Sequence, residues 1–472
     1  MFKQPYHDWE MKHELINNKQ VDGFKYWNYM RRDMFMSFKD EYGNIEPPFY
    51  KNMKEGSGGN KKLEKIKKLV LPIEQDRVVK SDYLFLCHPR RQEIDGKMVS
   101  IYTDYIADNF PGSVTLQRSG AGKYKREDIY SKNLLFADGI REKSYVYRYF
   151  MKYTNPGKYK EIREKIKKDM EEPFRDLNEG YDLHPNTADF TERATVLYFL
   201  YKYRKKEYKK LLDKISPKVI VEVVGRSFDA EIINEIASER GIKTIELQHG
   251  TNTLWFPENV PFPQGPLWYF SFGEFWNEET RPGVPEGHML STGFPFHDIM
   301  MKDYPKEKRK QDKNAIIFLS GVKYGKELFE AAAGLKKLRP ELDVIFKLHP
   351  MEYDIYMEKY PGVTESGVRV IGDRKTPLYS LFAESYMQVG VESTAILEGM
   401  GFELATFIYD HPMAVAMKGI LDKGYAKMFK TPEELAALTD AAKESAPAYD
   451  LNDFWKENSL ETITDLIRRI HG

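Results

Sequence analysis

The chain has 472 residues, 41% of them hydrophobic, and its 72 lysines and arginines equal its 72 aspartates and glutamates in number. This length predicts about two to four domains of roughly 100–200 residues each. The balanced charge excludes a protein that binds polyanions over its whole surface, so we expect no nucleic-acid partner. Cys87 is the only cysteine, which excludes an internal disulfide and favours a reducing compartment. No run approaches the roughly 18–20 apolar residues that cross a bilayer, and the N-terminus lacks the apolar centre of a secretory signal, so we expect a soluble, cytoplasmic protein.

The first part of the chain predicts a parallel α/β domain that follows an aromatic and basic N-terminal stretch. Within that stretch, residues 30–38 favour an amphipathic helix. Apolar runs predict strands at 83–87, 134–136, 219–224, 244–247 and 268–272. The helical pattern at 229–240 lies between two of these strands, which is typical of a βαβ unit. Charged helices are expected at 158–168 and 200–215.

A second alternating series begins after residue 313 and predicts another doubly wound domain. Its strands are expected at 315–319, 343–347, 368–371, 386–389 and 406–409, and its helices at 325–338, 377–383, 394–400 and 432–443. We therefore expect an N-terminal domain over 1–295, a hinge over 296–313 and a C-terminal domain over 314–455. A last helix within 456–472 would pack back on the first domain.

Polar residues directly after strands are candidates for a binding site, because ligands of open α/β sheets lie outside the carboxyl ends of the strands. Lys347 and His349 follow the strand at 343–347 on one face, and Pro350 ends the ladder there. Two donor groups at one sheet edge suit a phosphate. A histidine that only caps a loop carbonyl is an equally good reading.

A second candidate follows the strand at 386–389, where Ser393 and Thr394 open a helix. Hydroxyls beside unpaired backbone N–H groups favour an anion, although an ordinary N-cap by Ser393 is the commoner reason for such a pair. Glu398 lies about one turn further on, where it would reach a ribose hydroxyl or remain a solvated acid.

The third candidate lies in the first domain, where Glu246 ends a strand and His249 and Gly250 form the turn after it. A neutral imidazole at a strand end can act as general base on an acceptor hydroxyl. The alternative is a buried histidine that satisfies the turn.

Other motifs are less informative. The stretch 119–124 (SGAGKY) departs from a phosphate-binding loop, because Gln117 and Tyr124 replace required residues. His411-Pro412 is interpreted as a loop that follows a strand. There is no Asp-x-Asp and no metal-spaced Cys/His set, so we expect neither a metal nor a cofactor.

The combination of the KLHP motif at 347–350 with Ser393-Thr394 resembles motifs of bacterial capsule and lipooligosaccharide glycosyltransferases that use CMP-activated sugars, such as sialyltransferases and Kdo transferases. His249-Gly250-Thr251 resembles a segment of the CDP-glycerol glycerophosphotransferases. Segments 88–104 and 218–251 also look like those of capsule-cluster glycosyltransferases. The resemblance covers most of 80–445. It implies the GT-B architecture, in which two Rossmann-like doubly wound domains face a central cleft and the C-terminal one holds the nucleotide.

The resemblance further implies roles for individual residues. Lys347 and His349 would hold the donor phosphate from one loop, and Ser393 and Thr394 would hold it from the opposite loop. The turn Ser320-Gly321 would border the same pocket.

The resemblance also implies a general base. Its sialyltransferase-like members place two acids before a glycine in the first domain, whereas each Asp-Gly dipeptide here has one acid. His249 is therefore the preferred base, and Asp104 and Glu246 follow it.

Four hypotheses about function result. The first is an inverting, metal-independent glycosyltransferase that moves a sugar from a nucleotide-activated, CMP-linked donor to a saccharide or lipid-linked acceptor of a surface polysaccharide. The second transfers a polyol phosphate from a CDP-linked donor, the third is a UDP-sugar 2-epimerase, and the fourth is a nucleotide-sugar-binding scaffold without turnover. The basic runs at 61–68 and 201–218 would place the protein on the inner face of the cell membrane, or would simply be solvated.

Overall fold

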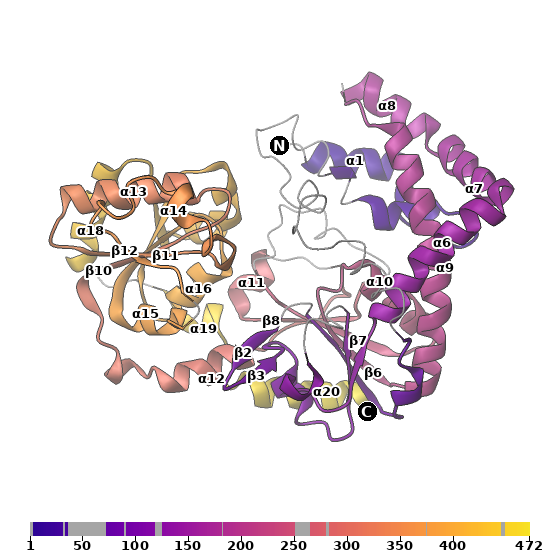
Figure 1. The fold of residues 1–472 in the computed structure, drawn as a ribbon, viewed down its shortest axis with the longest axis horizontal. Coiled ribbons are helices and arrows are strands. Elements are labelled where there is room, and N and C mark those ends of the chain that lie inside the picture. Colours follow the sequence, from indigo (N-terminus) through magenta and orange to yellow (C-terminus); the bar gives the residue numbers. More distant parts are fainter. Residues whose placement is uncertain are drawn as a thin grey trace.

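The computed structural model describes residues 3–31, 34–35, 72–88, 91–118, 125–181, 183–250, 265–279, 283–373, 375–444 and 449–472. These residues form two parallel α/β sheets, each with helices on both faces, and a helical extension of the first (Figure 1). The architecture is therefore two Rossmann-like domains, and the fold class predicted from the sequence is confirmed.

The N-terminal sheet has the strand order β5-β4-β1-β6-β7-β8-β9, and every neighbouring pair is parallel. Its strands are β1 (Tyr83–Cys87), β4 (Val114–Gln117), β5 (Leu134–Phe136), β6 (Val219–Val223), β7 (Lys243–Leu247), β8 (Trp268–Ser271) and β9 (Met289–Ser291). A short antiparallel hairpin, β2 (Gln92–Ile94) with β3 (Lys97–Val99), precedes α5 (Asp104–Ala107).

Alternation along the strands divides the N-terminal core into two layers, one on each face of the sheet. Leu84 and Leu86 of β1 pack with the helices of one face, whereas Phe85 between them packs on the other. The first face is covered by α9 and α10, and the helical extension continues from it. These helices are α1 (Lys3–Lys12), α2 (Leu15–Asn18), α6 (Asp138–Thr154), α7 (Pro156–Asp169), α8 (Glu171–Tyr181), α9 (Thr187–Ile215) and α10 (Phe228–Glu239).

The C-terminal sheet has the order β12-β11-β10-β13-β14-β15 and is also entirely parallel. Its strands are β10 (Asp312–Leu319), β11 (Asp343–Lys347), β12 (Arg369–Ile371), β13 (Ser385–Gly390), β14 (Ala405–Tyr409) and β15 (Ala426–Phe429). The helices are α13 (Gly325–Leu338), α14 (Tyr356–Lys359), α15 (Leu378–Glu384), α16 (Thr394–Met400), α17 (Lys418–Asp422) and α18 (Pro432–Glu444).

The chain crosses between the domains twice. The first crossing includes α12 (Pro295–Asp303), a helix that begins at a proline with its φ already suited to the first turn, so the segment expected as a hinge is partly helical. An earlier helix, α11 (Glu274–Glu279), connects β8 to β9 within the N-terminal domain. The second crossing runs through α19 (Leu451–Phe454) to α20 (Ser459–His471). Ile463 and Ile467 of α20 pack with Phe85 on the open face of the N-terminal sheet, and Figure 1 shows α20 beneath that sheet.

Candidate functional site

In the C-terminal sheet the strand order reverses between β10 and β13, which is the point where an open α/β sheet leaves a crevice. Ser320 and Gly321 follow β10, and Glu392 lies in the loop that follows β13. Tyr324 joins the two loops, because its hydroxyl donates to the carbonyl of Glu392 at 2.7 Å. A Cβ on Gly321 would come within 2.3 Å of the Tyr324 ring, so this contact requires glycine.

Four adjacent strands of this sheet end in candidate residues. In spatial order, β11 is followed by His349, β10 by Ser320, β13 by Ser393 and Thr394, and β14 by His411. Neighbouring parallel strands are about 4.8 Å apart, so these ends form one continuous edge. The structure therefore brings His349, Ser320 and the hydroxyl pair to the same side of the C-terminal domain.

A buried carboxylate, Glu352, ties the first two of these strand ends together. Its Oε2 accepts hydrogen bonds from Ser320 Oγ at 2.8 Å and from the backbone N–H of His349 at 3.0 Å. Its Oε1 accepts from Tyr360 at 2.6 Å and pairs with Lys359. Burial alone would raise the pKa of Glu352, but these hydrogen bonds lower it below the ordinary value. Glu352 was not among the predicted residues, although its position three residues after His349 is the spacing of a capping box.

The ring of His349 is held in one orientation by its own turn. Nδ1 accepts a hydrogen bond from the backbone N–H of Met351 at 3.2 Å, and Pro350 starts the short 3₁₀ helix that follows. A neutral imidazole whose Nδ1 accepts carries its proton on Nε2. His349 can therefore donate one hydrogen bond from Nε2.

Lys347 turns away from the hydroxyl pair. Its Nζ donates to the carbonyl of Asp373 at 2.9 Å and to the hydroxyl of Tyr353 at 3.1 Å, on the β12 side of the edge. The side chains of Lys347 and His349 therefore do not converge as predicted: the backbone carbonyl of Lys347 accepts from the Ser320 N–H at 3.0 Å, but its ammonium group lies towards β12.

Ser393 and Thr394 have different positions at the start of α16. Ser393 is the N-cap, and its Oγ accepts from the backbone N–H of Ala395 at 3.1 Å, so its own hydrogen remains to be donated. Thr394 faces the N-terminal domain: a Cβ on Gly250 would lie 3.1 Å from Thr394 Oγ1. The turn after β7 and the start of α16 therefore meet at the interdomain junction.

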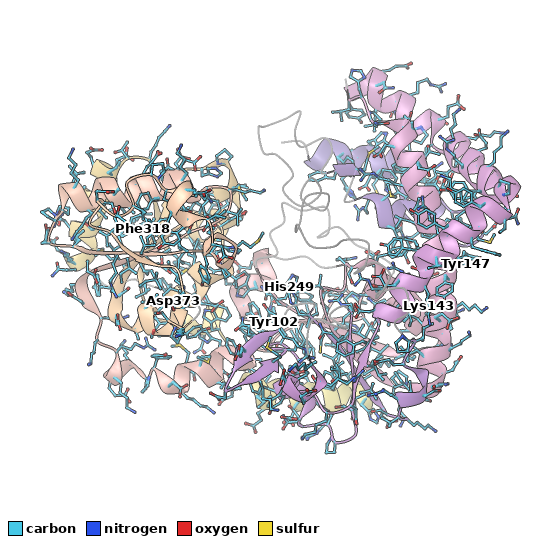
Figure 2. All side chains as sticks on the ribbon, in the orientation of Figure 1. Tyr102, Lys143, Tyr147, His249, Phe318 and Asp373 are labelled. Carbon is cyan, nitrogen blue, oxygen red and sulfur yellow. The ribbon has the colours of Figure 1, made fainter. Side chains whose placement is uncertain are left out.

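His249 lies at this junction with two other aromatic side chains. The hydroxyl of Tyr102 donates to the carbonyl of His249 at 2.8 Å, and the His88 ring is centred 6.0 Å from the His249 ring. Figure 2 shows Tyr102 and His249 together, on the side of the N-terminal domain that faces the C-terminal one. His88 was not predicted, yet it carries the same signal as His349 and His411, a His-Pro dipeptide directly after a parallel strand.

Glu398 is partly buried in the C-terminal domain, beside Tyr379, and is therefore not a fully solvated acid. Burial raises the pKa of Glu398 to about 7, an effect that the neighbouring hydroxyl of Tyr379 partly opposes. A carboxyl group with such a pKa can accept or donate a proton near neutral pH.

Asp104 and Glu246, the two carboxylates proposed as alternative general bases, are both buried in the structure. Asp104 is 2% exposed, and its Oδ2 pairs with Arg91 at 2.8 Å while Oδ1 accepts from Ser131. Glu246 is 5% exposed, and its Oε1 accepts from the backbone N–H of Gly225 at 2.9 Å. Both carboxylates are thus internal to the N-terminal domain, Glu246 on β7 and Asp104 at the start of α5.

Glu246 also has an acidic neighbour. Glu222 is its register partner on β6, and both carboxylates lie against Gly225, where a Cβ would be 2.6 Å from Glu222 Oε1 and 2.9 Å from Glu246 Oε2. Burial beside Glu246 raises the pKa of Glu222. This pair therefore favours a shared proton over two charges.

The part of the chain that the structure describes contains no cluster of three or more His, Cys, Asp or Glu residues able to bind a metal. Among the same residues no helix is long and apolar enough to cross a membrane. Thr251 and the basic run at 61–68 lie outside the described residues.

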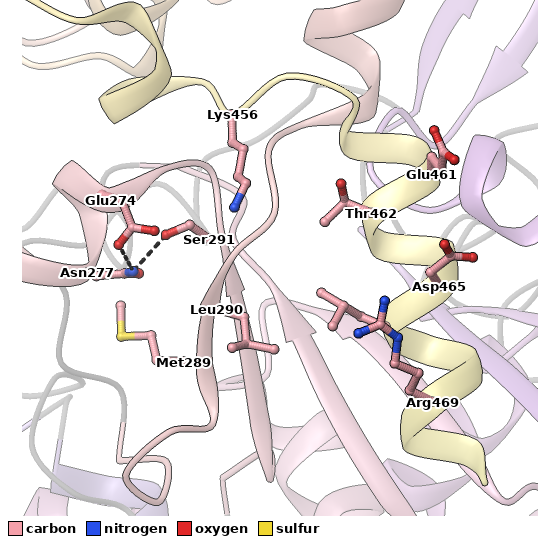
Figure 3. A pocket seen from close by; sticks show the side chains of 11 residues that line it. Glu274, Asn277, Met289, Leu290, Ser291, Lys456, Glu461, Thr462, Asp465 and Arg469 are labelled. Carbon is pink, nitrogen blue, oxygen red and sulfur yellow. Dashed lines mark hydrogen bonds between the residues drawn. The ribbon is translucent and has the colours of Figure 1, made fainter.

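A separate pocket of about 500 Å³ lies between β9 and α20, away from these residues (Figure 3). Lys456 and Arg469 line it together with Glu274, Glu461 and Asp465, so charges of both signs are present. None of the predicted site residues lines this pocket.

No protein-family model matches the chain, and no curated protein matches it. Similar folds occur among solved structures. A putative UDP-N-acetylglucosamine 2-epimerase from Listeria monocytogenes is 12% identical, with a TM-score of 0.48 and coverage of 82% of this chain and 96% of that one. The wall teichoic acid polymerase TagF is 11% identical, with a TM-score of 0.44 and coverage of 94% and 98%. The UDP-GlcNAc 2-epimerase of Methanocaldococcus jannaschii is 14% identical, with a TM-score of 0.42 and coverage of 58% and 82%. Because these sequence identities and TM-scores are low, the fold is assigned from the sheet topology of the chain itself.

Proposed function

We propose that the protein is an inverting, metal-independent glycosyltransferase that moves a sugar from a CMP-linked donor to a saccharide or lipid-linked acceptor of a surface polysaccharide. The observation that carries this proposal is the alignment of His349, Ser320 and Ser393-Thr394 along one sheet edge, with His249 across the interdomain junction. Donor and acceptor would bind on opposite sides of that junction.

The donor phosphate would be held by hydrogen-bond donors instead of a metal ion. The hydrogen bond that Nδ1 accepts from the Met351 N–H fixes the ring of His349, and Ser393 retains its hydroxyl hydrogen. Donors that are fixed before the reaction stabilise the charge that develops on the leaving phosphate oxygen. Glu398, with its raised pKa, would contact a ribose hydroxyl.

His249 would be the general base. It takes the proton of the acceptor hydroxyl, the acceptor oxygen bonds to the anomeric carbon from the face opposite the phosphate, and the bond from that carbon to the phosphate oxygen breaks. The electron pair of the broken bond leaves on CMP. Tyr102 fixes the backbone carbonyl of His249, which positions this turn against Thr394.

A CDP-linked polyol-phosphate donor is the second candidate, and it is favoured by the histidine at the junction in place of an acidic pair. The same base would activate the acceptor hydroxyl, but the hydroxyl would attack phosphorus and release CMP. The product then contains a phosphodiester in place of a glycosidic bond.

The test is a thermal-shift screen with CMP, CDP, UMP, UDP and GDP, followed by turnover assays with CMP-sugars and CDP-polyols. A nucleotide at about 100 times its Kd stabilises a protein by roughly 2.7 kcal/mol. We expect cytidine nucleotides to stabilise the chain and His349→Ala to remove both the shift and the turnover. Normal turnover by the folded His349→Ala variant would contradict the proposal. Turnover of a UDP-sugar without any acceptor would indicate an epimerase, and binding without turnover would indicate a scaffold.

A further inference from the structure

The outer side of α6 exposes a group of large apolar side chains. Among the described residues, thirteen large hydrophobic side chains are exposed, and five of them lie within nine residues of this helix, with exposed fractions from 39% to 75%. We call this group the aromatic face; it consists of Tyr145, Val146, Tyr149, Phe150 and Tyr153. Single exposed apolar residues are ordinary, but a contiguous group marks an interaction surface.

The opposite side of α6 already packs on the protein. Ser144 is fully buried, and the ring of Tyr147 is centred 5.5 Å from that of Tyr203 on α9. Figure 2 shows Lys143 and Tyr147 on the side of the N-terminal domain that is remote from the C-terminal domain. The helix thus has two apolar sides, and the described part of the domain covers one of them.

Basic residues border the aromatic face on both sides. At about 100° per residue, Arg141, Arg148 and Lys152 lie along one border and Lys143 along the other. The Arg148 guanidinium lies 4.6 Å from the centre of the Tyr149 ring. Helix α6 itself contains four lysines and arginines against two aspartates and glutamates, although the whole chain is neutral. The borders of the aromatic face are therefore basic.

We propose that the aromatic face of α6 docks on the surface of an anionic lipid bilayer. Tyrosine and phenylalanine favour the boundary between headgroups and acyl chains, and flanking lysines and arginines pair with anionic headgroups. A second copy of the chain is the less favourable occupant, because a two-fold interface through α6 would bring the same cations together. This inference rests on the proposed function. Docking would hold the enzyme at the membrane, where a lipid-linked acceptor resides.

The experiment is co-flotation of the full chain with vesicles of phosphatidylcholine alone and of phosphatidylcholine with phosphatidylglycerol. We expect flotation only with the anionic vesicles and its loss in high salt. The double variant Phe150→Ser/Tyr153→Ser should bind these vesicles at least tenfold more weakly. The matched control Leu338→Ser/Met428→Ser, which removes two exposed apolar side chains from the C-terminal domain, should bind like the wild type.

Two results would overturn the docking proposal. One is equal flotation of the wild type and the α6 variant, or none with either. The other is a concentration-dependent dimer in light scattering that the α6 variant abolishes, which would assign the face to a second copy. Nucleotide thermal shifts of the same variants keep the two proposals separate, because failure of nucleotide binding with intact flotation rejects the proposed function alone.

Discussion

Gly250 of the N-terminal domain and Thr394 of the C-terminal domain lie so close together that a Cβ on Gly250 would be 3.1 Å from Thr394 Oγ1. This is tighter than an ordinary van der Waals contact, so one side chain must shift to admit a methyl group. The contact couples the turn that contains the candidate base to the loop that contains the candidate phosphate donors.

Gly250→Ala is expected to lower kcat by about tenfold, because a displacement of about 1 Å in a reacting geometry can cost about 10²-fold and the shift required here is smaller. The measurement is steady-state turnover together with the midpoint of thermal unfolding. Gly157→Ala is the matched control, since nothing lies within 4 Å of a Cβ at that position. Equal activity of both variants would show that the contact does not position the site.

His249→Gln is expected to lower kcat by about 10²–10⁴-fold while the nucleotide Kd stays unchanged, because a general base acts on the acceptor and not on the donor. Turnover and isothermal titration with the nucleotide test this. A weakened nucleotide Kd with little loss of kcat would place His249 in the donor site instead.

Glu352→Gln is expected to weaken folding and nucleotide binding together. The substitution leaves Lys359 facing a neutral amide, and breaking a buried ion pair typically costs about 3–5 kcal/mol. Urea unfolding and nucleotide titration measure the two effects, with the exposed neighbour Glu358→Gln as control. Because the folded pKa of Glu352 is lowered, its contribution is present above the unfolded pKa and is lost as the pH falls through the folded value.

Glu398 gives the opposite pH dependence. Its pKa is raised to about 7 in the folded chain, so its protonated form is favoured by folding. Its contribution is complete below the unfolded pKa of about 4.3 and declines as pH rises towards 7, by at most about 1.4 kcal/mol per pH unit. Urea unfolding at pH 5, 6, 7 and 8 should therefore show a shallower decline for Glu398→Gln than for the wild type. Parallel curves would exclude this titration.

Asp104→Asn is expected to destabilise the N-terminal domain by about 3–5 kcal/mol, because Arg91 would keep its buried charge without a carboxylate to neutralise it. The fraction that remains folded should bind nucleotide with an unchanged Kd. Urea unfolding and titration check both statements, and a large loss of turnover per folded molecule without destabilisation would restore Asp104 as a catalytic candidate.

The sequence predicted most strands of both sheets because parallel strands buried on both faces are continuous apolar runs. The strand predicted at 343–347 and the helix predicted at 394–400 have the bounds of β11 and α16. A helix was predicted only from residue 200, whereas α9 begins at Thr187. The β-branched and aromatic residues at 195–201 favour a strand, so the helical pattern there was not recognised. β4, β9 and β15 were missed because polar residues interrupt their short apolar runs: Thr115 and Gln117 in β4, Ser291 in β9 and Lys427 in β15.

The sequence predicted those residues of the candidate site that directly follow a recognisable strand. His349 and Ser393 follow predicted strands, so the sheet-edge rule singled them out, whereas Ser320 was added only by the resemblance. Glu352 was missed because its role depends on hydrogen bonds to two different strand ends. The burial of Asp104 was equally hidden, since its partner Arg91 lies on a separate segment.

The position of α20 has a consequence for biosynthesis. The ribosome releases the N-terminal sheet before the C-terminal domain, yet Ile463 and Ile467, which cover one side of that sheet, follow the whole C-terminal domain in the chain. That side stays open to water, or to a chaperone, during translation of the entire C-terminal domain. The domain that emerges first is thus the one completed last.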